Sequence, residues 1–162
     1  MTVLNDRTEL IELMSHYADI ADLKDFDERP GRVFTEQLAL DFESVAGIPP
    51  ATVPLGDYVG ILRASFAPWQ ATYHAITGHA IEVDGDRAAI HAHVRAEHWL
   101  ADGRRWLVVG FYDNEAVRTP KGWRLSRVKL TASHQENAQL AAVATGSAPE
   151  DSTTTAQPAS EV

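Results

Sequence analysis

The sequence predicts an α+β domain in which helices pack on one face of a curved antiparallel sheet. Two observations carry this prediction. Apolar residues recur at helical spacing over residues 6–24 and 55–66, whereas residues 71–131 consist of four β-rich segments separated by short turns. The length of 162 residues suits one domain with a sizeable core, and because the chain has no cysteine, that core is stabilised without disulfides.

The first expected element is an amphipathic helix over residues 6–24, with Asn5 or Asp6 as its N-cap. Its apolar stripe consists of Leu10, Ile11, Leu13, Met14, Tyr17, Ala18 and Ala21. After this helix, Pro30 and Gly31 interrupt a second, short helical stretch. The N-terminal part of the chain therefore provides helical cover for the sheet that follows.

The central part of the chain is expected to contain a strand, a loop and a helix. Residues 39–46 are interpreted as a strand. Residues 48–54 contain three prolines, which cannot share a strand ladder, so this segment is predicted to be a loop. Residues 55–66 return to helical spacing, and this helix ends near Pro68.

An antiparallel meander is expected from Ala71 to about Thr131. Its turns at residues 83–86, 101–104 and 119–122 are short, and turns of this length make neighbouring strands antiparallel.

The folded domain is expected to span residues 1–135, and residues 136–162 are expected to form a C-terminal extension. After a short helix, this extension lacks the apolar content that would offset its ordering entropy. Most of it is therefore predicted to be disordered.

The charge of the chain limits its partners. The formal net charge is −9, and it is −6 without the three acidic residues of the C-terminal tail. A body this acidic repels phosphate groups, so a hydrophobic small molecule is favoured as partner over nucleic acid or an anionic membrane. Asp6 and Glu9 stand where a signal peptide would be basic and then apolar, and no run approaches the roughly 20 apolar residues of a membrane span. We therefore expect a cytoplasmic protein.

Two of the seven histidines raise the question of a metal site. Residues 85–103 resemble the first motif of the cupin family, with His91, His93 and Glu97 on one strand face as candidate ligands. A second cupin motif is absent, and Arg95 shares the face of the candidate ligands. We therefore favour a solvated strand face without a metal or cofactor, and keep a metal-dependent cupin as the remote alternative. The inner face of this strand would be Ala92, Val94 and Ala96.

One acidic residue of the first helix lies where an apolar residue is expected. Asp22 follows Ala18 by four residues and Met14 by eight, so it projects from the apolar stripe. A carboxylate aimed at the core is costly unless it is paired or hydrogen-bonded. Spacing alone leaves two possibilities open, a paired carboxylate in the core or a helix end that emerges into solvent.

His74 is the candidate partner of Asp22. It begins the meander in a segment otherwise rich in Ala, Ile and Thr, which favours a side chain on the concave side of the sheet. An aspartate that accepts a hydrogen bond from Nδ1–H leaves Nε2 free as a base and stabilises the imidazolium. The alternative is a histidine that belongs simply to the core. No role is assigned to His79 or His98.

Three segments of the chain resemble the SnoaL-like branch of the NTF2-like superfamily. They are YADIADLKDFDERPGRVF from Tyr17, ATYHAITGHAIEVDGDRAAI from Ala71 and VVGFYDNEAVRTPKGWRLSRVKL from Val108. The resemblance covers about residues 7–132. It implies a cone in which a strongly curved antiparallel sheet wraps around helices and encloses an apolar pocket, and it implies a homodimer or homotrimer.

The segment around Asp22 is similar to scytalone dehydratase and to hexachlorocyclohexane dehydrochlorinase, two families that use an Asp–His dyad for elimination. The resemblance implies that His74 is the base and that Asp22 orients it. Scytalone dehydratase has two tyrosines that hydrogen-bond its substrate through water, and this chain has Ala21 and Phe42 at the corresponding positions. The second catalytic histidine of that family is replaced near Gly110 and Phe111. Scytalone itself is therefore not the expected substrate. Positions that match the pocket walls of these families are Tyr17, Phe42, Trp69, Phe111 and Tyr112.

The function expected from these residues is that of a cofactor-independent lyase or isomerase. His74 would remove a proton from a hydrophobic cyclic substrate, Asp22 would balance the imidazolium, and a leaving group would depart with help from Tyr17 or water. The same deprotonation would start an intramolecular aldol reaction, which makes a polyketide cyclase the first alternative. A non-catalytic protein that binds a small molecule in its pocket is the second alternative.

Overall fold

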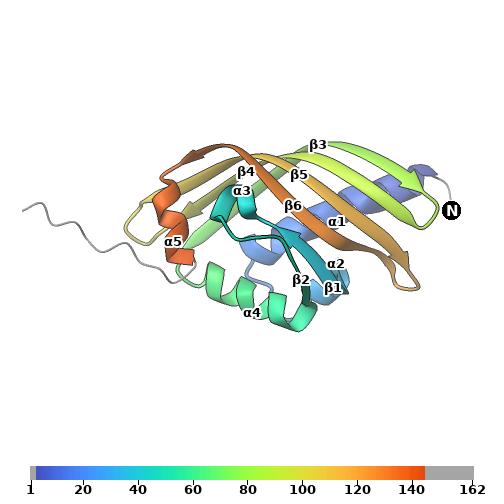
Figure 1. Cartoon of the computed structure of the whole chain (residues 1–162), viewed down its shortest axis with the longest axis horizontal. Coiled ribbons are helices and arrows are strands. Elements are labelled where there is room, and N and C mark those ends of the chain that lie inside the picture. Colours follow the sequence, from blue (N-terminus) through green and yellow to red (C-terminus); the bar gives the residue numbers. More distant parts are fainter. Residues whose placement is uncertain (1–2, 145–162) are drawn as a thin grey trace, which may run out of the picture.

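Six strands form one curved sheet, and the helices lie on its concave side (Figure 1). The structure is a computed structural model that describes residues 3–144. The helices are α1 (Val3–Asp22), α2 (Pro30–Val33), α3 (Glu43–Ala46), α4 (Leu55–Phe66), the 3-10 turn η1 (Ala138–Leu140) and α5 (Ala141–Ala144). The strands are β1 (Phe34–Asp41), β2 (Ala51–Pro54), β3 (Ala71–Asp84), β4 (Arg87–Trp99), β5 (Arg105–Thr119) and β6 (Gly122–Glu136). The predicted α+β class is confirmed.

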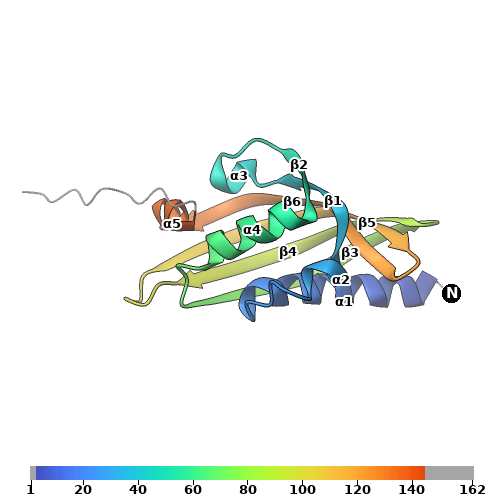
Figure 2. The same ribbon diagram turned by 90° about the horizontal axis from the view of Figure 1, so that it is seen from below.

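The four long strands form the predicted antiparallel meander, and β1 and β2 extend it. The strand order is β2-β1-β6-β5-β4-β3, and consecutive strands from β3 to β6 pair antiparallel. Strand β1 is the exception, because it pairs with β6 in parallel. Helix α1 runs alongside β3, while α4 crosses the middle of the sheet (Figure 2). The space between these helices and the sheet is where a pocket can form.

Two predictions for the central part of the chain are wrong. The first strand covers residues 34–41 rather than 39–46, because residues 43–46 form the short helix α3. The predicted loop at residues 48–54 contains the strand β2. Proline is tolerated there because β2 is an edge strand and Pro54 is its last residue. The missing backbone N–H of proline therefore removes no hydrogen bond between inner strands of the sheet.

Two expectations for the N-terminal helices also need correction. Helix α1 begins at Val3, so neither Asn5 nor Asp6 is its N-cap. Asp6 is instead buried, and its carboxylate accepts hydrogen bonds from Arg118 at 2.7 Å and from the Trp123 indole at 3.4 Å. At the second helix, proline begins α2 rather than interrupting it, since the first helical turn needs no amide donor at that position.

Helix α1 contributes most of its apolar stripe to the core. Leu10, Leu13, Met14 and Ala21 of the stripe are buried. Ile11, which the spacing places in the stripe, is 41% exposed. Among the described residues no helix is long and apolar enough to cross a membrane.

The chain after β6 turns back toward the helices. The short helix expected there is present as η1 and α5, and Leu140 is buried in the core. The disorder predicted for the rest of the extension concerns residues 145–162, which lie outside the described residues.

Gly110 is required because the backbone of β6 lies close to it, beside a register shift between the two strands. A Cβ atom at this position would lie 2.0 Å from the carbonyl oxygen of Thr131. We expect Gly110→Ala to lower the free energy of unfolding by about 2–3 kcal/mol, measured by urea denaturation, because backbone must shift to relieve the contact.

Gly60 provides the matched control for this prediction. It is exposed in α4, and a Cβ atom there meets nothing within 4 Å. Gly60→Ala should raise the free energy of unfolding by roughly 0.5–1 kcal/mol through helix propensity. Equal effects of the two substitutions would refute the role assigned to Gly110.

Candidate active site

Asp22 and His74 form a hydrogen-bonded pair between the end of α1 and the start of β3. Asp22 Oδ1 lies 2.6 Å from His74 Nδ1 and 2.8 Å from the Thr72 hydroxyl, which donates to it. Asp22 Oδ2 accepts a hydrogen bond of 2.8 Å from the backbone N–H of His74. The side chains of Asp22 and His74 are only 17% and 10% exposed. The structure therefore places Asp22 in the paired position that its spacing on the helix left open.

The ionisation of Asp22 determines which nitrogen of His74 carries the proton. Burial by itself raises the pKa of Asp22, but the hydrogen bonds from His74 and Thr72 outweigh it and hold the pKa below its ordinary value. An ionised carboxylate can only accept, so the Nδ1 atom of His74 is the donor. In the neutral ring the Nε2 atom then has a free lone pair and can act as a base.

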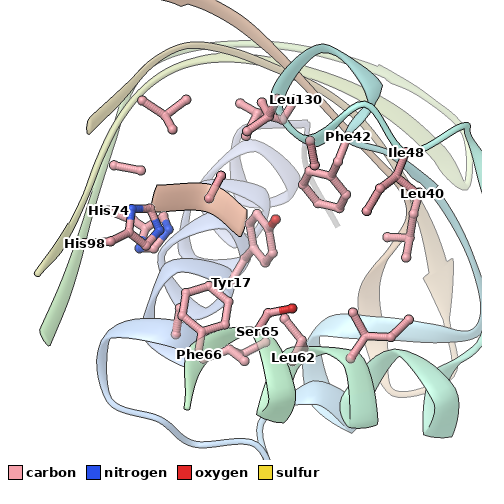
Figure 3. Close-up of a pocket in the computed structure, with 18 of the residues that line it drawn as sticks. Tyr17, Leu40, Phe42, Ile48, Leu62, Ser65, Phe66, His74, His98 and Leu130 are labelled. Carbon is pink, nitrogen blue, oxygen red and sulfur yellow. The ribbon is translucent and has the colours of Figure 1, made fainter. Parts of the chain in front are cut away.

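The ring of His74 forms part of the wall of a cavity between the helices and the sheet (Figure 3). The cavity has a volume of about 290 Å³, which lies at the small end of the range for ligand pockets. Figure 3 shows His74 and His98 on one side of it and Leu40, Phe42 and Ile48 on the opposite side. Ile48 and Ile61 are about half exposed and mark its rim, whereas Trp69 at the inner end is 1% exposed.

The described residues that line the cavity are mostly apolar, and none of them is Lys, Arg, Asp or Glu. The lining residues with imidazole or hydroxyl groups are Tyr17, Tyr58, Ser65, His74, His98 and Tyr112. Such a surface suits an uncharged ring-containing molecule, because burial of apolar area provides the affinity and the few polar groups orient the ligand.

Four of the five predicted wall residues line the cavity, and one does not. Tyr17, Phe42, Trp69 and Tyr112 face it. Phe111 lies on the outer face of the sheet, with its ring centroid 5.4 Å from that of His91 and 5.0 Å from that of His93. Successive side chains of a strand point to opposite faces, so Phe111 must point outward when its neighbour Tyr112 is buried. The prediction that Phe111 belongs to the pocket wall is therefore wrong.

His98 is a site residue to which the sequence analysis assigned no role. Its ring lies 5.3 Å from that of His74 in an edge-to-face arrangement and is stacked 4.5 Å from that of Trp106. Burial and the neighbouring His74 lower the pKa of His98 to about 3, so its imidazole is neutral at physiological pH. A second imidazole therefore lies beside His74, although the comparison with scytalone dehydratase indicated that a second histidine had been replaced near residues 110 and 111.

The sequence contained a signal for His98. The same alternation that directs Ala92, Val94 and Ala96 to the inner face of β4 directs residue 98 there as well. The opposite face carries the side chains considered as metal ligands, and His91 and His93 are exposed as expected. His91 pairs with Asp113 at 2.7 Å, while Glu97 accepts hydrogen bonds from two arginines. The predicted alternation of the strand is confirmed.

Comparison with known proteins places the chain among SnoaL-like proteins. The profile of the SnoaL-like domain family matches residues 2–129. A crystal structure of the Kfla4162 protein of Kribbella flavida is 66% identical, covers 86% of this chain and 99% of its own, and superposes with a TM-score of 0.84. An uncharacterised protein of Mycobacterium tuberculosis is 28% identical over 76% of this chain and 83% of its own length.

A structure of a hexachlorocyclohexane dehydrochlorinase shares the fold at 18% identity. Its TM-score is 0.70, and the match covers 82% of this chain and 88% of that one.

The neutral state of His98 predicts a pH dependence of stability. A histidine in the unfolded chain has a pKa of about 6.5, and it therefore takes up a proton below that pH. In the folded protein the pKa of His98 is about 3, so His98 stays neutral over the same range and the unfolded state binds more protons. The free energy of unfolding should therefore decrease as the pH falls from about 6.5 to 4.5, by up to about 1.4 kcal/mol per pH unit from this group. Replacing the ring by an apolar one in His98→Phe should flatten this dependence in urea denaturation curves.

An exposed histidine of β4 that forms no ion pair among the described residues serves as control, because His93→Phe removes an imidazole that stands on the outer face of the sheet. This variant should keep the slope of the parent protein. An unchanged slope in His98→Phe would contradict the buried neutral state.

Proposed function

The chain belongs to the SnoaL-like domain family, and on this basis we propose that it is a cofactor-independent lyase or isomerase acting on a hydrophobic cyclic small molecule. The observation that carries the proposal is the Asp22–His74 pair, in which Nδ1 is bound 2.6 Å from the carboxylate and the ring contributes to the wall of an apolar cavity. This arrangement has the parts of a general base: a proton acceptor, a group that orients it and a site for a substrate.

In the proposed reaction the Nε2 atom of His74 accepts a proton from a carbon of the substrate. The electron pair of the broken C–H bond forms a double bond to the neighbouring carbon, and the leaving group departs with the electrons of its own bond. The resulting imidazolium is stabilised by the ionised carboxylate of Asp22, so the protonated pair carries no net charge in the low-dielectric pocket.

A departing hydroxyl group needs a proton, and the structure favours one source for it. Burial, together with the neighbouring Tyr112 and Tyr58, raises the pKa of Tyr17 well above its ordinary value, so Tyr17 is a poor proton donor. The imidazolium of His74 holds the proton it has just accepted and can pass it to the hydroxyl. Elimination then returns the neutral base without any other reagent.

Proton exchange tests this proposal before the natural substrate is known. We expect the protein to accelerate deuterium incorporation from D₂O into 2-tetralone, an uncharged bicyclic ketone with acidic C–H bonds, followed by NMR. His74→Ala should lower the rate constant by about 10²–10⁴-fold, because the general base is lost. Asp22→Asn should lower it by about tenfold or more, because the ring loses the group that orients it.

An outer-face pair of similar geometry provides the control. His91 Nδ1 lies 2.7 Å from Asp113 Oδ1, and these side chains are 45% and 52% exposed. His91→Ala should leave the exchange rate unchanged. Equal rates in the parent protein and His74→Ala would exclude the dyad mechanism, whereas binding without exchange would favour a non-catalytic protein. Ring closure of an added polyketide would instead identify a cyclase that uses the same base.

A further inference from the structure

The carboxylate of Asp22 accepts a hydrogen bond from a residue other than His74. The hydroxyl of Thr72 donates to Oδ1 at 2.8 Å, and this is the same oxygen that lies 2.6 Å from His74 Nδ1. The second oxygen, Oδ2, is bound separately by the backbone N–H of His74 at 2.8 Å. Thr72 and the imidazole therefore share one oxygen atom, so the strength of one hydrogen bond affects the other.

The position of Thr72 on β3 explains why its hydroxyl reaches this oxygen. Residues two apart on a strand point to the same face, so the side chains of Thr72 and His74 both meet the end of α1. Threonine is β-branched, which restricts its χ1 rotamer and suits a strand. A hydroxyl has one hydrogen to donate, and an ionised carboxylate accepts it more strongly than a neutral group does. The contact is thus fixed by the strand and by the charge of Asp22.

The charge of the Asp22–His74 pair indicates what this hydroxyl does. With a neutral ring the pair carries one negative charge, and with one added proton it carries none. A hydroxyl that donates to the carboxylate stabilises the negative state more than the uncharged state, wherever the added proton resides. Thr72 therefore makes the pair take up its proton at a lower pH than it would without the hydroxyl. General-base chemistry depends on the form without this proton.

The other side chains that act on the pair keep a constant charge near neutral pH. Burial and the neighbouring His74 lower the pKa of His98 on β4 to about 3, and burial raises the pKa of Tyr112 on β5 to about 12. From α4 the neighbour of the His74 ring is Phe66, which is uncharged and lies 6.2 Å away between ring centroids. A change in the protonation of the pair can therefore be attributed to the pair and to Thr72.

We propose that Thr72 is a positioning residue of the dyad, whose hydroxyl holds Oδ1 of Asp22 and thereby keeps His74 in the state that accepts a proton at neutral pH. The inference rests on the proposed function of His74 as a base. In the reaction the substrate proton moves to Nε2, and the carboxylate stabilises the imidazolium through Nδ1. The O–H bond of Thr72 stays intact throughout, because its oxygen contacts the carboxylate and not the reacting nitrogen.

Titration of the His74 ring by NMR tests the inference without any substrate. The Cε1–H signal of the ring is assigned by its loss in His74→Ala, and the midpoint is the pH at which half of the rings have changed state. Thr72→Val keeps the shape of the side chain and removes the hydroxyl, so the midpoint should rise by roughly 0.5–1 pH unit. Thr72→Ala removes the same hydroxyl and should raise the midpoint as well. Thr72→Ser keeps a hydroxyl and should restore the midpoint of the parent protein.

Thr77 provides the matched control, because it is an exposed threonine on the same strand. Thr77→Val makes the same chemical change away from the pair and should leave the midpoint of His74 unchanged. Circular dichroism checks that each variant is folded at the temperature of the titration.

The pH profile of deuterium exchange into 2-tetralone separates the inference from the proposed function. On the acidic side of the profile, Thr72→Val should lower the rate constant by about threefold to tenfold, because less of the pair can accept a proton. The profiles of the variant and the parent protein should converge at high pH. Absence of exchange in the parent protein, together with a raised midpoint in Thr72→Val, would refute the proposed function and leave the effect of Thr72 on the pair standing.

An unchanged midpoint in folded Thr72→Val and Thr72→Ala would overturn the inference, and would leave Thr72 as a residue that only fastens α1 to β3. A midpoint of Thr72→Ser equal to that of Thr72→Val would overturn it as well, because the hydroxyl would then not be the cause of the shift.

Discussion

The carboxylate of Asp22 is the constraint on which the rest of the site depends. It lies at the C-terminal end of α1, where the helix dipole disfavours a negative charge, and it is largely buried. Three hydrogen bonds from Thr72 and His74 offset these costs and at the same time fasten the helix to β3. The other end of the helix is held by a second buried carboxylate, Asp6, which Arg118 and Trp123 bind. The depth of the cavity is set by the position of a helix that is fixed in this way.

The pocket combines a paired charge with neutral surroundings. Asp22 is ionised and bound, whereas His98 is kept neutral by burial and by the proximity of His74. The lining residues that the structure describes include no cation, so no fixed positive charge competes with the imidazole for the carboxylate. Trp69 and Trp106 are buried lining residues, and apolar surroundings of this kind strengthen electrostatic interactions within the site. A small number of polar groups can therefore determine which molecule binds and how it is oriented.

Local periodicity predicted those elements whose signal lies within a few residues. The long helices, the antiparallel meander and the inner and outer faces of β4 follow from spacings of 3.6 and 2 residues. The errors occurred where a partner distant in the sequence decides the outcome. Residues 51–54 are a strand because β1 offers an edge, and Asp6 is buried because Arg118 and Trp123 bind its carboxylate. Phe111 faces outward, as the alternation of β5 requires, in contrast to the pocket position that the resemblance to other families implies.

Local spacing shows that Asp22 interrupts an apolar stripe and that His74 stands in an apolar strand. The resemblance to a family implies that the two residues belong together. Tertiary packing brings them to 2.6 Å, and the chain between them, which separates the two residues by 52 positions, carries no periodic signal of their approach. The same holds for other residues that line the cavity. His98, Tyr17, Tyr58 and Tyr112 come from four separate elements, and their meeting depends on the curvature of the sheet and on the packing of α1 and α4 beneath it. Local spacing encodes the direction of a side chain, whereas distances between elements are set by packing of the whole core.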